Sequence, residues 1–595
     1  MFLRSKKRCK DGKTHRYWSV VENRRARSGR VVQRQLLFLG EINDSQEAAW
    51  RETLEVFDEV EQRAVTLSLF PEDREVPADA LDGVQVKLKE MELRRARAYG
   101  NYWLGCKLWE RLGLSEFWEG RLARGREEVP WAKVLELLVV SRLVSPGSEF
   151  RLHRQGFDQS AMGELLGTGL AVAEKDRLYR CLDRILEHKQ ALFDHLRQRW
   201  QDLFQAEFEV LLYDLTSTYI EGEGEEIPKA KHGYSRDHRF DCRQVVIALV
   251  ITPEGFPLAY EVMEGNTSDR TTLRGFLAKI EAQYGRARRV WVMDRGIPTE
   301  EVLEEMRAPE REVFYLVGTP RGKIQQYEKK WLELPWRKVR ESVEVKLFAE
   351  DGELYVLAKS EGRRAKERAM RRRKLARLLK ALRKLRRSCP ARDQLLLRMG
   401  AAKKAAGRAF SFVTIRLPDE GKEVTRQAFT FRLDKAKVEK AELRDGHYLL
   451  RSNLLSADPS VLWERYVQLT QIEAAFKTLK SELGLRPIYH QLEKRVEAHI
   501  FVAFLAYALS VTLKQRLEAL ASGLTPRAIL EKLATIQMLD VCFPTTDGRW
   551  LIMPRYTQPE PDQQLMLHRL GLRLPSQPPP RIKAQAVPGS VPQRL

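Results

Sequence analysis

The hydrophobic positions along the chain change their spacing several times, and each change marks a different kind of expected structure. In the first forty residues, the β-rich runs HRYWSVVENR and RVVQRQLLFLGEI flank the polar segment RARSG, which predicts a twisted hairpin. Between about 84 and 206, apolar side chains recur three and four positions apart, as in WAKVLELLVVSRL, and this spacing predicts helices. The intervening segment LFPEDREVPADALDG is rich in proline and acids and predicts a linker.

From Phe208 onward, short apolar runs replace the helical spacing. FEVLLYD, QVVIALVIT and PLAYEVM predict three successive strands, and SDRTTLRGFLAKIEAQYG predicts a helix with Ser268 or Asp269 as its cap. RRVWVMDRG and VFYLVG predict two more strands, with a short helix around TEEVLEEM between them. This order of elements is typical of a mixed α/β sheet with helices on its faces.

Between about 321 and 465 the pattern leaves that sheet. VEVKLFAE, ELYVLAKS, FSFVTIRL and GHYLLRSNL have strand character, and a helix from about Gly362 to Arg387 lies among them. We therefore expect a β-rich insertion that carries a helical arm. Strong helices return at 459–483 and 494–520, and the Pro- and Gln-rich tail from Pro575 is expected to be disordered.

Most of the positive charge lies in two segments. The formal charge of the chain is +22, and residues 1–34 hold 12 Lys and Arg against 2 acids. Residues 361–408, which we call the basic arm, hold 19 Lys and Arg against 3 acids, so the rest of the chain is nearly neutral. Concentrated charge of this kind indicates contact with the phosphates of a nucleic acid, and a solvated Arg-rich helix is the alternative.

Composition also excludes several classes of protein. We find no run of eighteen or more apolar residues, so no membrane partner is expected, and the basic N-terminus lacks the apolar core of a secretory signal. The six cysteines are far apart and form no C-x-x-C pair. This spacing argues against a disulfide framework and a zinc knuckle, and it fits a reducing cytoplasm.

Two acids, Asp214 and Asp294, each end an expected strand. Side chains at strand ends project into the crevice where α/β sheets bind ligands. With a third acid from a helix they would suit Mg²⁺, and two such ions roughly 4 Å apart activate the attacking oxygen and stabilise the leaving oxygen in phosphoryl transfer. Taken singly, each acid is more often a turn residue, because Asp also starts turns.

Helix geometry supplies the third acid. In YVQLTQIEAAFKTLKSELG, Tyr466, Glu473 and Lys480 recur every seven residues and should share one helical face. That face lies beside an apolar stripe formed by Ile472, Phe476, Leu479 and Leu483. We expect Glu473 to hold a metal ion and its two neighbours to hold phosphates; a solvated face with an ordinary Glu is the alternative.

Four segments in order carry a resemblance to a known family. They are VLLYDLTSTYIEG, then HGYSRDHRFDCRQVVIALVITPEGFPLAYEVMEGNTSD, then VWVMDRG, then YVQLTQIEAAFKTLKSELGLRPIYH. Together they resemble the DDE insertion-sequence transposases of bacteria, in the group marked by a Tyr-Arg-Glu-Lys signature. The similarity extends from about Phe208 to His499, and the basic hairpin and helical block before it also look like this group.

The resemblance implies an RNase H-like catalytic domain, a mixed sheet flanked by helices and interrupted by the insertion. Asp214, Asp294 and Glu473 would be its catalytic and metal-binding triad, holding two Mg²⁺ ions for which Mn²⁺ can substitute. Water would first free a 3′ hydroxyl, which then attacks target DNA or, to form a hairpin, the opposite strand. The signature falls on Tyr466, Leu469, Glu473 and Lys480, so Leu replaces its Arg. The missing phosphate contact is then absent or supplied by a neighbour such as Arg465 or Lys477.

Further residues are expected to meet DNA. The full set of expected DNA-binding residues is Tyr466, Lys477 and Lys480, the arm residues Arg371, Arg372, Arg373 and Lys374, and Arg236. Arg236 lies with His232 and His238 in KHGYSRDHR, which either touches DNA or orders a loop. Trp331 and Trp336 are candidates for filling the space of a flipped base, and a buried core position is the alternative.

The expected function is that of a transposase that binds terminal inverted repeats and performs cut-and-paste transposition. Its partners would be double-stranded DNA, at the repeats and the target, and a second copy of itself, in the bacterial cytoplasm at the nucleoid. A nuclease of the same fold without strand transfer, and a catalytically silent DNA-binding protein, are the rivals. The expected regions are 1–45 (basic hairpin), 46–206 (linker and helical DNA-end-binding domain), 207–320 (first part of the catalytic core), 321–465 (insertion), 466–520 (final core helices) and 521–595 (C-terminal region with the tail).

Overall fold

The computed structural model describes residues 2–10, 13–25, 31–41, 54–58, 63–67 and 86–583, except for 123–128, 286, 309–310, 312, 320–333, 341–342, 456–457 and 547. The chain forms two compact units. The first unit comprises Met1–Ala206, Ser217–Val245 and Ala475–Leu595, and the second comprises Glu207–Thr216 and Val246–Ala474.

The N-terminal part of the first unit is a three-stranded antiparallel sheet of β1 (Phe2–Lys10), β2 (Lys13–Arg25) and β3 (Val31–Glu41). The expected hairpin is therefore confirmed as β2 and β3. Strand β1, which pairs with β2 over its whole length, was not expected. Its sequence, FLRSKKRCK, is basic and lacks the alternation of apolar and polar residues that predicts a strand.

A second sheet of the first unit joins segments from both ends of the chain. Its order is β5 (Arg63–Leu67), β4 (Leu54–Asp58), β20 (Arg581–Lys583), β19 (Trp550–Tyr556), β18 (Gln537–Pro544) and β6 (Glu92–Ala98). Two expectations are corrected here, because 46–83 contains the strands β4 and β5 and the tail is ordered as far as β20. The predicted linker LFPEDREVPADALDG lies outside the described residues. Such short strands are stabilised by partners hundreds of residues away, which a local pattern does not reveal.

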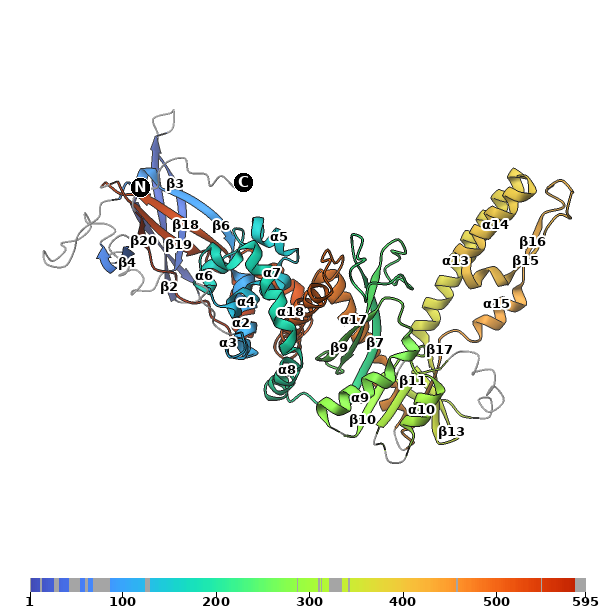
Figure 1. Cartoon of the computed structure of the whole chain (residues 1–595). Coiled ribbons are helices and arrows are strands. Elements are labelled where there is room, and N and C mark those ends of the chain that lie inside the picture. The colour runs from blue at the N-terminus through green and yellow to red at the C-terminus, as the bar shows by residue number, and fades with distance from the viewer. Residues whose placement is uncertain are drawn as a thin grey trace. The chain divides into compact units, whose positions relative to one another are not determined.

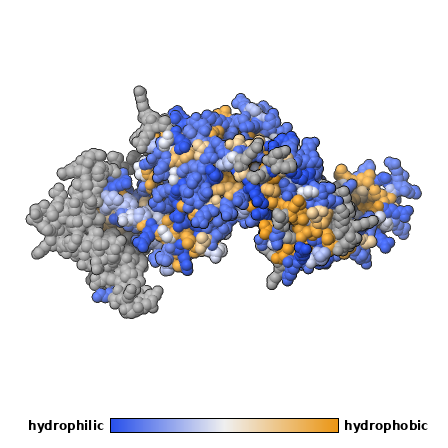
Figure 2. All heavy atoms as spheres, turned by 90° about the horizontal axis from the view of Figure 1, so that it is seen from below, coloured by the Kyte–Doolittle hydropathy of each residue, from blue (hydrophilic) through white to orange (hydrophobic). Residues whose placement is uncertain are grey.

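The expected helical block is confirmed. Its helices are α2 (Gly100–Arg111), α3 (Leu114–Glu119), α4 (Trp131–Val144), α5 (Glu149–Arg151), α6 (Met162–Leu166), α7 (Lys175–Ile185) and α8 (Lys189–Phe204). They pack around α18 (Glu493–Leu520), which contacts α2, α4, α7 and α8. Helix α18 is long and apolar enough to cross a membrane, but 94% of its most apolar window is buried. On the face drawn in Figure 2, hydrophilic residues predominate at the described surface, and we interpret α18 as a core helix.

The second unit is built on a large mixed sheet (Figure 1). Among the described residues nine strands form it, in the order β12, β13, β14, β17, β11, β10, β7, β8, β9. Their bounds are β7 Val210–Tyr219, β8 Gln244–Ile251, β9 Pro257–Glu264, β10 Arg289–Met293, β11 Val313–Gly318, β12 Arg337–Arg340, β13 Val343–Glu350, β14 Glu353–Ser360 and β17 His447–Ser452. Strand β10 runs parallel to both β7 and β11, whereas β17 is antiparallel to β11. The expected mixed sheet flanked by helices is confirmed.

One face of this sheet packs against α9 (Leu273–Tyr284) and α10 (Glu300–Met306). The strands contribute alternate residues to that core, such as Leu211, Tyr213 and Leu215 of β7 and Trp291 and Met293 of β10. Because successive side chains of a strand point to opposite faces, the intervening residues face away from α9 and α10.

The insertion differs from the separate β-rich body that the sequence suggested. Strands β12, β13, β14 and β17 continue the main sheet beyond β11, because β17 pairs with both β11 and β14. The part that leaves the sheet is mainly helical: α13 (Glu361–Ser388) and α14 (Arg392–Ala406) lie side by side (Figure 1). The small pair β15 (Val413–Arg416) and β16 (Thr430–Leu433) and helix α15 (Lys435–Glu442) complete it.

Candidate active site

The two aspartates lie at the same level of neighbouring strands. The expectation that each ends its strand is confirmed for Asp294, which directly follows β10, and is wrong for Asp214, because β7 continues beyond it to Tyr219. Strands β7 and β10 are parallel, and the last residues in their register are Tyr213 and Met293. Asp214 and Asp294 follow these two residues directly, so they lie level with each other on adjacent strands about 4.8 Å apart. Tyr213 and Met293 both belong to the core under α9 and α10, which places both carboxylates on the opposite face.

Each carboxylate is partly oriented by its own backbone. Asp214 Oδ1 accepts a hydrogen bond from the Leu215 amide at 2.8 Å, and Asp294 Oδ1 accepts one from the Arg295 amide, also at 2.8 Å. Asp214 is half-buried and Asp294 is exposed. Two carboxylates directed to one face of a sheet repel each other, and hard divalent cations are the partners that such a pair prefers.

The third acid, Glu473, comes from helix α17 (Leu469–Lys477) of the same unit. Its side chain is exposed and makes no hydrogen bond or ion pair with the described residues. The preceding helix α16 (Pro459–Val467) contacts β10 and β11, the strands beside Asp294. Among the described residues, the acids and histidines whose ligand atoms lie within 4.8 Å of one another are Glu149, His490 and His499, and they do not include Glu473. The role of Glu473 as third ligand therefore stays a prediction.

Tyr466 lies beside Asp294. A methyl group added to Gly318, the last residue of β11, would lie 2.8 Å from the Tyr466 hydroxyl. Gly318 follows Val317, the register partner of Met293, so it is level with Asp294 and on the same face. Burial raises the pKa of Tyr466, and the charge of Asp294 raises it further, so the phenol keeps its proton at neutral pH.

The expectation that Tyr466, Glu473 and Lys480 share one face of a continuous α-helix is wrong. Helix α16 ends at Val467, α17 begins at Leu469, and a π-helix occupies Thr478–Glu482. The wider turn of a π-helix shifts the seven-residue repeat, and such turns are frequent at functional sites. Lys480 Nζ lies 3.0 Å from Asp237 Oδ1, with both side chains less than 10% exposed. It is therefore held by a protein carboxylate, and its contact with phosphate stays a prediction.

The loop that contains Arg236 is internally braced. Its Arg236 amide donates to Ser217 Oγ at 3.1 Å, and Ser235 Oγ accepts from the Arg239 amide at 3.1 Å. Arg486 also pairs with Asp237 from the segment after the π-helix. These bonds support the expectation that KHGYSRDHR orders a loop, and they leave open whether it touches DNA.

The two tryptophan candidates differ in outcome. Trp336 packs partly buried against a small core of Tyr355, Leu357 and Leu449, which favours the core interpretation. Trp331 lies outside the described residues.

Of the alternative phosphate contacts near Leu469, Lys477 is exposed and Arg465 is half-buried.

The basic arm contains both paired and unpaired cations. Arg371 forms an ion pair with Asp445, and their side chains are only 10% and 3% exposed. It is therefore held by a protein carboxylate, and its contact with DNA stays a prediction. Arg372, Arg373 and Lys374 are exposed and have no ion pair within the described chain. Helix α13 directs one stripe into the arm's own core: Leu375, Leu378, Leu382 and Leu385.

Sequence reasoning missed two features that the structure reveals. The first is Gly318, whose proximity to Tyr466 depends on strand register. The second is an exposed row on the side of α13 opposite the leucine stripe, formed by Arg373, Arg377, Lys380, Lys384 and Arg387. Their spacing of four, three, four and three residues is a signal that could have predicted this row.

Comparison with known proteins identifies the family of this chain. A family model described as a transposase DDE domain matches residues 205–509, just over half of the chain. This chain belongs to the DDE transposase family. A model of the N-terminal domain of IS1634 family transposases also matches, over residues 3–63. This chain is therefore an enzyme that cleaves DNA and transfers strands. Its family also implies that it depends on divalent metal ions. The Tyr-Arg-Glu-Lys signature itself is not confirmed.

Comparisons with curated proteins and with solved structures do not refine the family further. No curated protein matches the sequence of this transposase. Among solved structures, the cryo-EM structure of a piggyBac transposase synaptic complex with hairpin DNA is similar over 75% of this chain and 82% of that chain. The sequence identity is 9% and the TM-score is 0.35, a likeness too weak to support an argument.

Proposed function

We propose that this transposase performs cut-and-paste transposition of an insertion sequence, with Asp214, Asp294 and Glu473 holding two Mg²⁺ ions. The observation that carries the proposal is the register of β7 and β10, which makes both aspartates level on adjacent strands and on one face of the sheet. The donor set is entirely carboxylate, as hard cations that exchange with water and phosphate oxygens require. When bound, the ions would activate the attacking oxygen and stabilise the leaving oxygen.

The protein side chains would orient the DNA strand and donate hydrogen bonds. Tyr466 keeps its proton beside Asp294, so we propose that its hydroxyl donates to a phosphate oxygen of the DNA strand bound beside the two aspartates. Arg295, directly after Asp294, is exposed and places a positive charge at the same site. Leu469 supplies no charge, and exposed Lys477 is the nearest cation on α17 to take its place.

We propose that double-stranded DNA is bound along the basic arm. The row from Arg373 to Arg387 extends over about 21 Å of helix α13, at 1.5 Å per residue. None of its five cations has an ion-pair partner among the described residues, so their charge is available to phosphates. Joining the two ends of an insertion sequence requires both DNA ends to be held together. We therefore propose that the protein acts as a homodimer, in the bacterial cytoplasm at the nucleoid.

Asp214→Asn, Asp294→Asn and Glu473→Gln test the triad. Each should abolish Mg²⁺-dependent cleavage of a DNA fragment ending in the element's inverted repeat, while its binding to that fragment remains within about twofold. Each change keeps the side-chain size and removes the negative charge that a metal ligand requires. The matched control is Asp351→Asn in the β13–β14 turn, where φ is 53°, a conformation that Asn accepts readily. Full cleavage by any triad variant would contradict the proposal, and cleavage without joining by the native protein would favour a nuclease.

A further inference from the structure

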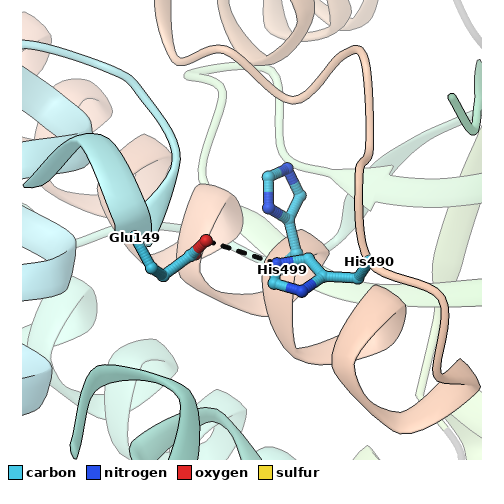
Figure 3. A group of neighbouring side chains, drawn as sticks. All are labelled: Glu149, His490 and His499. Atoms are coloured by element: carbon cyan, nitrogen blue, oxygen red, sulfur yellow. Dashed lines mark ion pairs between the residues drawn. The ribbon is translucent and has the colours of Figure 1, made fainter. Parts of the chain in front are cut away.

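A buried group of polar side chains in the first unit has no role in the chemistry described above. Glu149 comes from helix α5, His490 from the segment after the π-helix, and His499 from helix α18 (Figure 3). Their exposed fractions are 3%, 9% and 5%. A ligand atom from each lies within 4.8 Å of the others.

The spacing within this group is longer than that of strong ion pairs. Glu149 Oε2 lies 3.4 Å from His490 Nε2, and Arg142 Nη2 lies 3.5 Å from Glu149 Oε1. Hydrogen bonds between oppositely charged groups are usually about 2.7–2.9 Å long. Two ligands of a tetrahedral Zn²⁺, at bond lengths of roughly 2.0–2.1 Å, lie about 3.3–3.4 Å apart. The separation of Glu149 and His490 therefore matches two ligands of one ion.

His499 has the hydrogen bonding expected of a metal ligand. Its Nε2 lies 3.3 Å from the carbonyl oxygen of Leu485, so the N–H of the neutral ring donates there and Nδ1 keeps a lone pair. Histidines that bind metals commonly donate their second nitrogen to a backbone carbonyl in this way. Burial, assisted by the charge of Arg142, lowers the pKa of His499 to about 3, so the ring is neutral at physiological pH.

The carboxylate is also ready to bind a cation. Burial alone would raise the pKa of Glu149, but the hydrogen bond with His490 and the charge of Arg142 outweigh it and lower the pKa to about 2. A cavity of about 400 Å³ adjoins the group and is lined by all three residues together with Tyr179. This space admits a water molecule as a fourth ligand.

Arg142 is the cation that already faces the group. Its Nη1 donates to the Gly484 carbonyl at 3.1 Å, and its Nη2 lies 3.4 Å from His499 Nδ1. A metal ion would replace Nη2 as the partner of Glu149 and His499, while the bond from Nη1 to Gly484 could remain. Competition with a fixed positive charge lowers the affinity of the site, so binding is expected to be reversible.

We propose that Glu149, His490 and His499 bind one Zn²⁺ ion, separate from the catalytic carboxylates. Two imidazoles and one carboxylate favour Zn²⁺ over Mg²⁺, which prefers an all-oxygen set. The ion would connect α5, the segment before α18 and α18 itself. The site would therefore be structural: it fixes the chain that follows the helix carrying Glu473.

The test measures zinc in full-length protein in which the catalytic triad has been removed by Asp214→Asn, Asp294→Asn and Glu473→Gln. After incubation with ZnCl₂ and dialysis, elemental analysis should find one Zn²⁺ per chain. Co²⁺ in its place should show the visible absorption of a four-coordinate site. Because the background lacks the triad, the result is independent of whether the proposed transposition chemistry is correct.

Two variants assign the ion to these residues. His490→Gln and His499→Gln should each lower zinc affinity by at least about 100-fold, more than the loss of an outer-shell partner typically costs. The matched control is His195→Gln, which removes a part-buried imidazole bonded to the Leu112 carbonyl at 2.8 Å and should leave affinity unchanged. Absence of zinc from the triad-free protein would overturn the proposal whether or not the histidine variants fold. Zinc affinity in both histidine variants equal to that of the triad-free protein would do the same.

Discussion

The basic row on α13 allows a quantitative prediction about DNA binding. Replacing Arg373, Arg377, Lys380, Lys384 and Arg387 with Gln removes the five unpaired cations opposite the leucine stripe. Gln has a helix propensity close to those of Arg and Lys, and the buried leucines are unchanged, so the arm should keep its fold. The formal charge of +22 falls by five.

The size of the effect follows from counterion release. Each phosphate neutralised on B-DNA contributes about 0.9 to the slope of log affinity against log salt. If all five side chains contact phosphates, the variant's slope should be smaller by about 4.5. Between 50 and 200 mM salt, the native protein would then lose about 500-fold more affinity than the variant.

The assay is fluorescence anisotropy of a labelled duplex over that salt range, with circular dichroism to verify helix content. The matched control replaces five cations that already pair with acids: Lys107, Arg274, Lys514, Arg527 and Lys532, each to Gln. It lowers the net charge by the same amount, yet its salt slope should stay near that of the native protein. Parallel slopes for the native and row variants, or an equal decrease in the control, would refute the assignment of DNA to this row.

Three further predictions concern single residues. Tyr466→Phe should slow cleavage about 10- to 100-fold with little change in DNA binding, because one hydrogen bond to a charged group is worth about 1.5–3 kcal/mol; unchanged single-turnover cleavage would contradict a role for the hydroxyl. Arg371→Gln should lower the free energy of unfolding by about 3 kcal/mol, since it leaves buried Asp445 without its main partner; denaturant melts of the native and variant proteins measure this. Folding lowers the pKa of the Glu149 carboxyl from 4.5 to about 2. The ionised carboxylate therefore stabilises the folded state by about 3 kcal/mol above pH 4.5, and this stabilisation is lost as pH falls toward 2. In EDTA, the stability difference between native protein and Glu149→Gln should therefore shrink over that interval, and a constant difference would argue against the ionised carboxylate.

Local patterns were sufficient to predict most of the catalytic sheet. Alternating or continuous apolar runs marked β7, β8, β9, β10 and β11, and an acid directly follows β10, although β7 continues for five residues past Asp214. The charge of the arm was also visible without any structure, because it depends only on composition. These features depend on neighbours within a few residues, which the sequence contains directly.

Other features depended on residues that are distant in the chain. Lys480 meets Asp237 across 243 positions, and the break between α16 and α17 followed by a π-helix removes the shared face that a regular helix would give. The pairing of β17 with β11 joined the insertion to the main sheet, and β20 found its partner in β4. A local pattern contains no information about such partners.

The carboxylate site combines both kinds of information. The sequence by itself determined that Asp214 and Asp294 accompany apolar strands and that Glu473 lies on a helix, because these follow from local hydrophobic spacing. It did not reveal that β7 continues past Asp214 to Tyr219. Only the tertiary structure decided that the two aspartates are level and on one face, since a shift of one residue between β7 and β10 would have directed them to opposite faces. It also decided that Arg371 pairs with Asp445 while Arg373 is exposed and has no ion-pair partner among the described residues, because burial distinguishes neighbouring cations that are chemically alike.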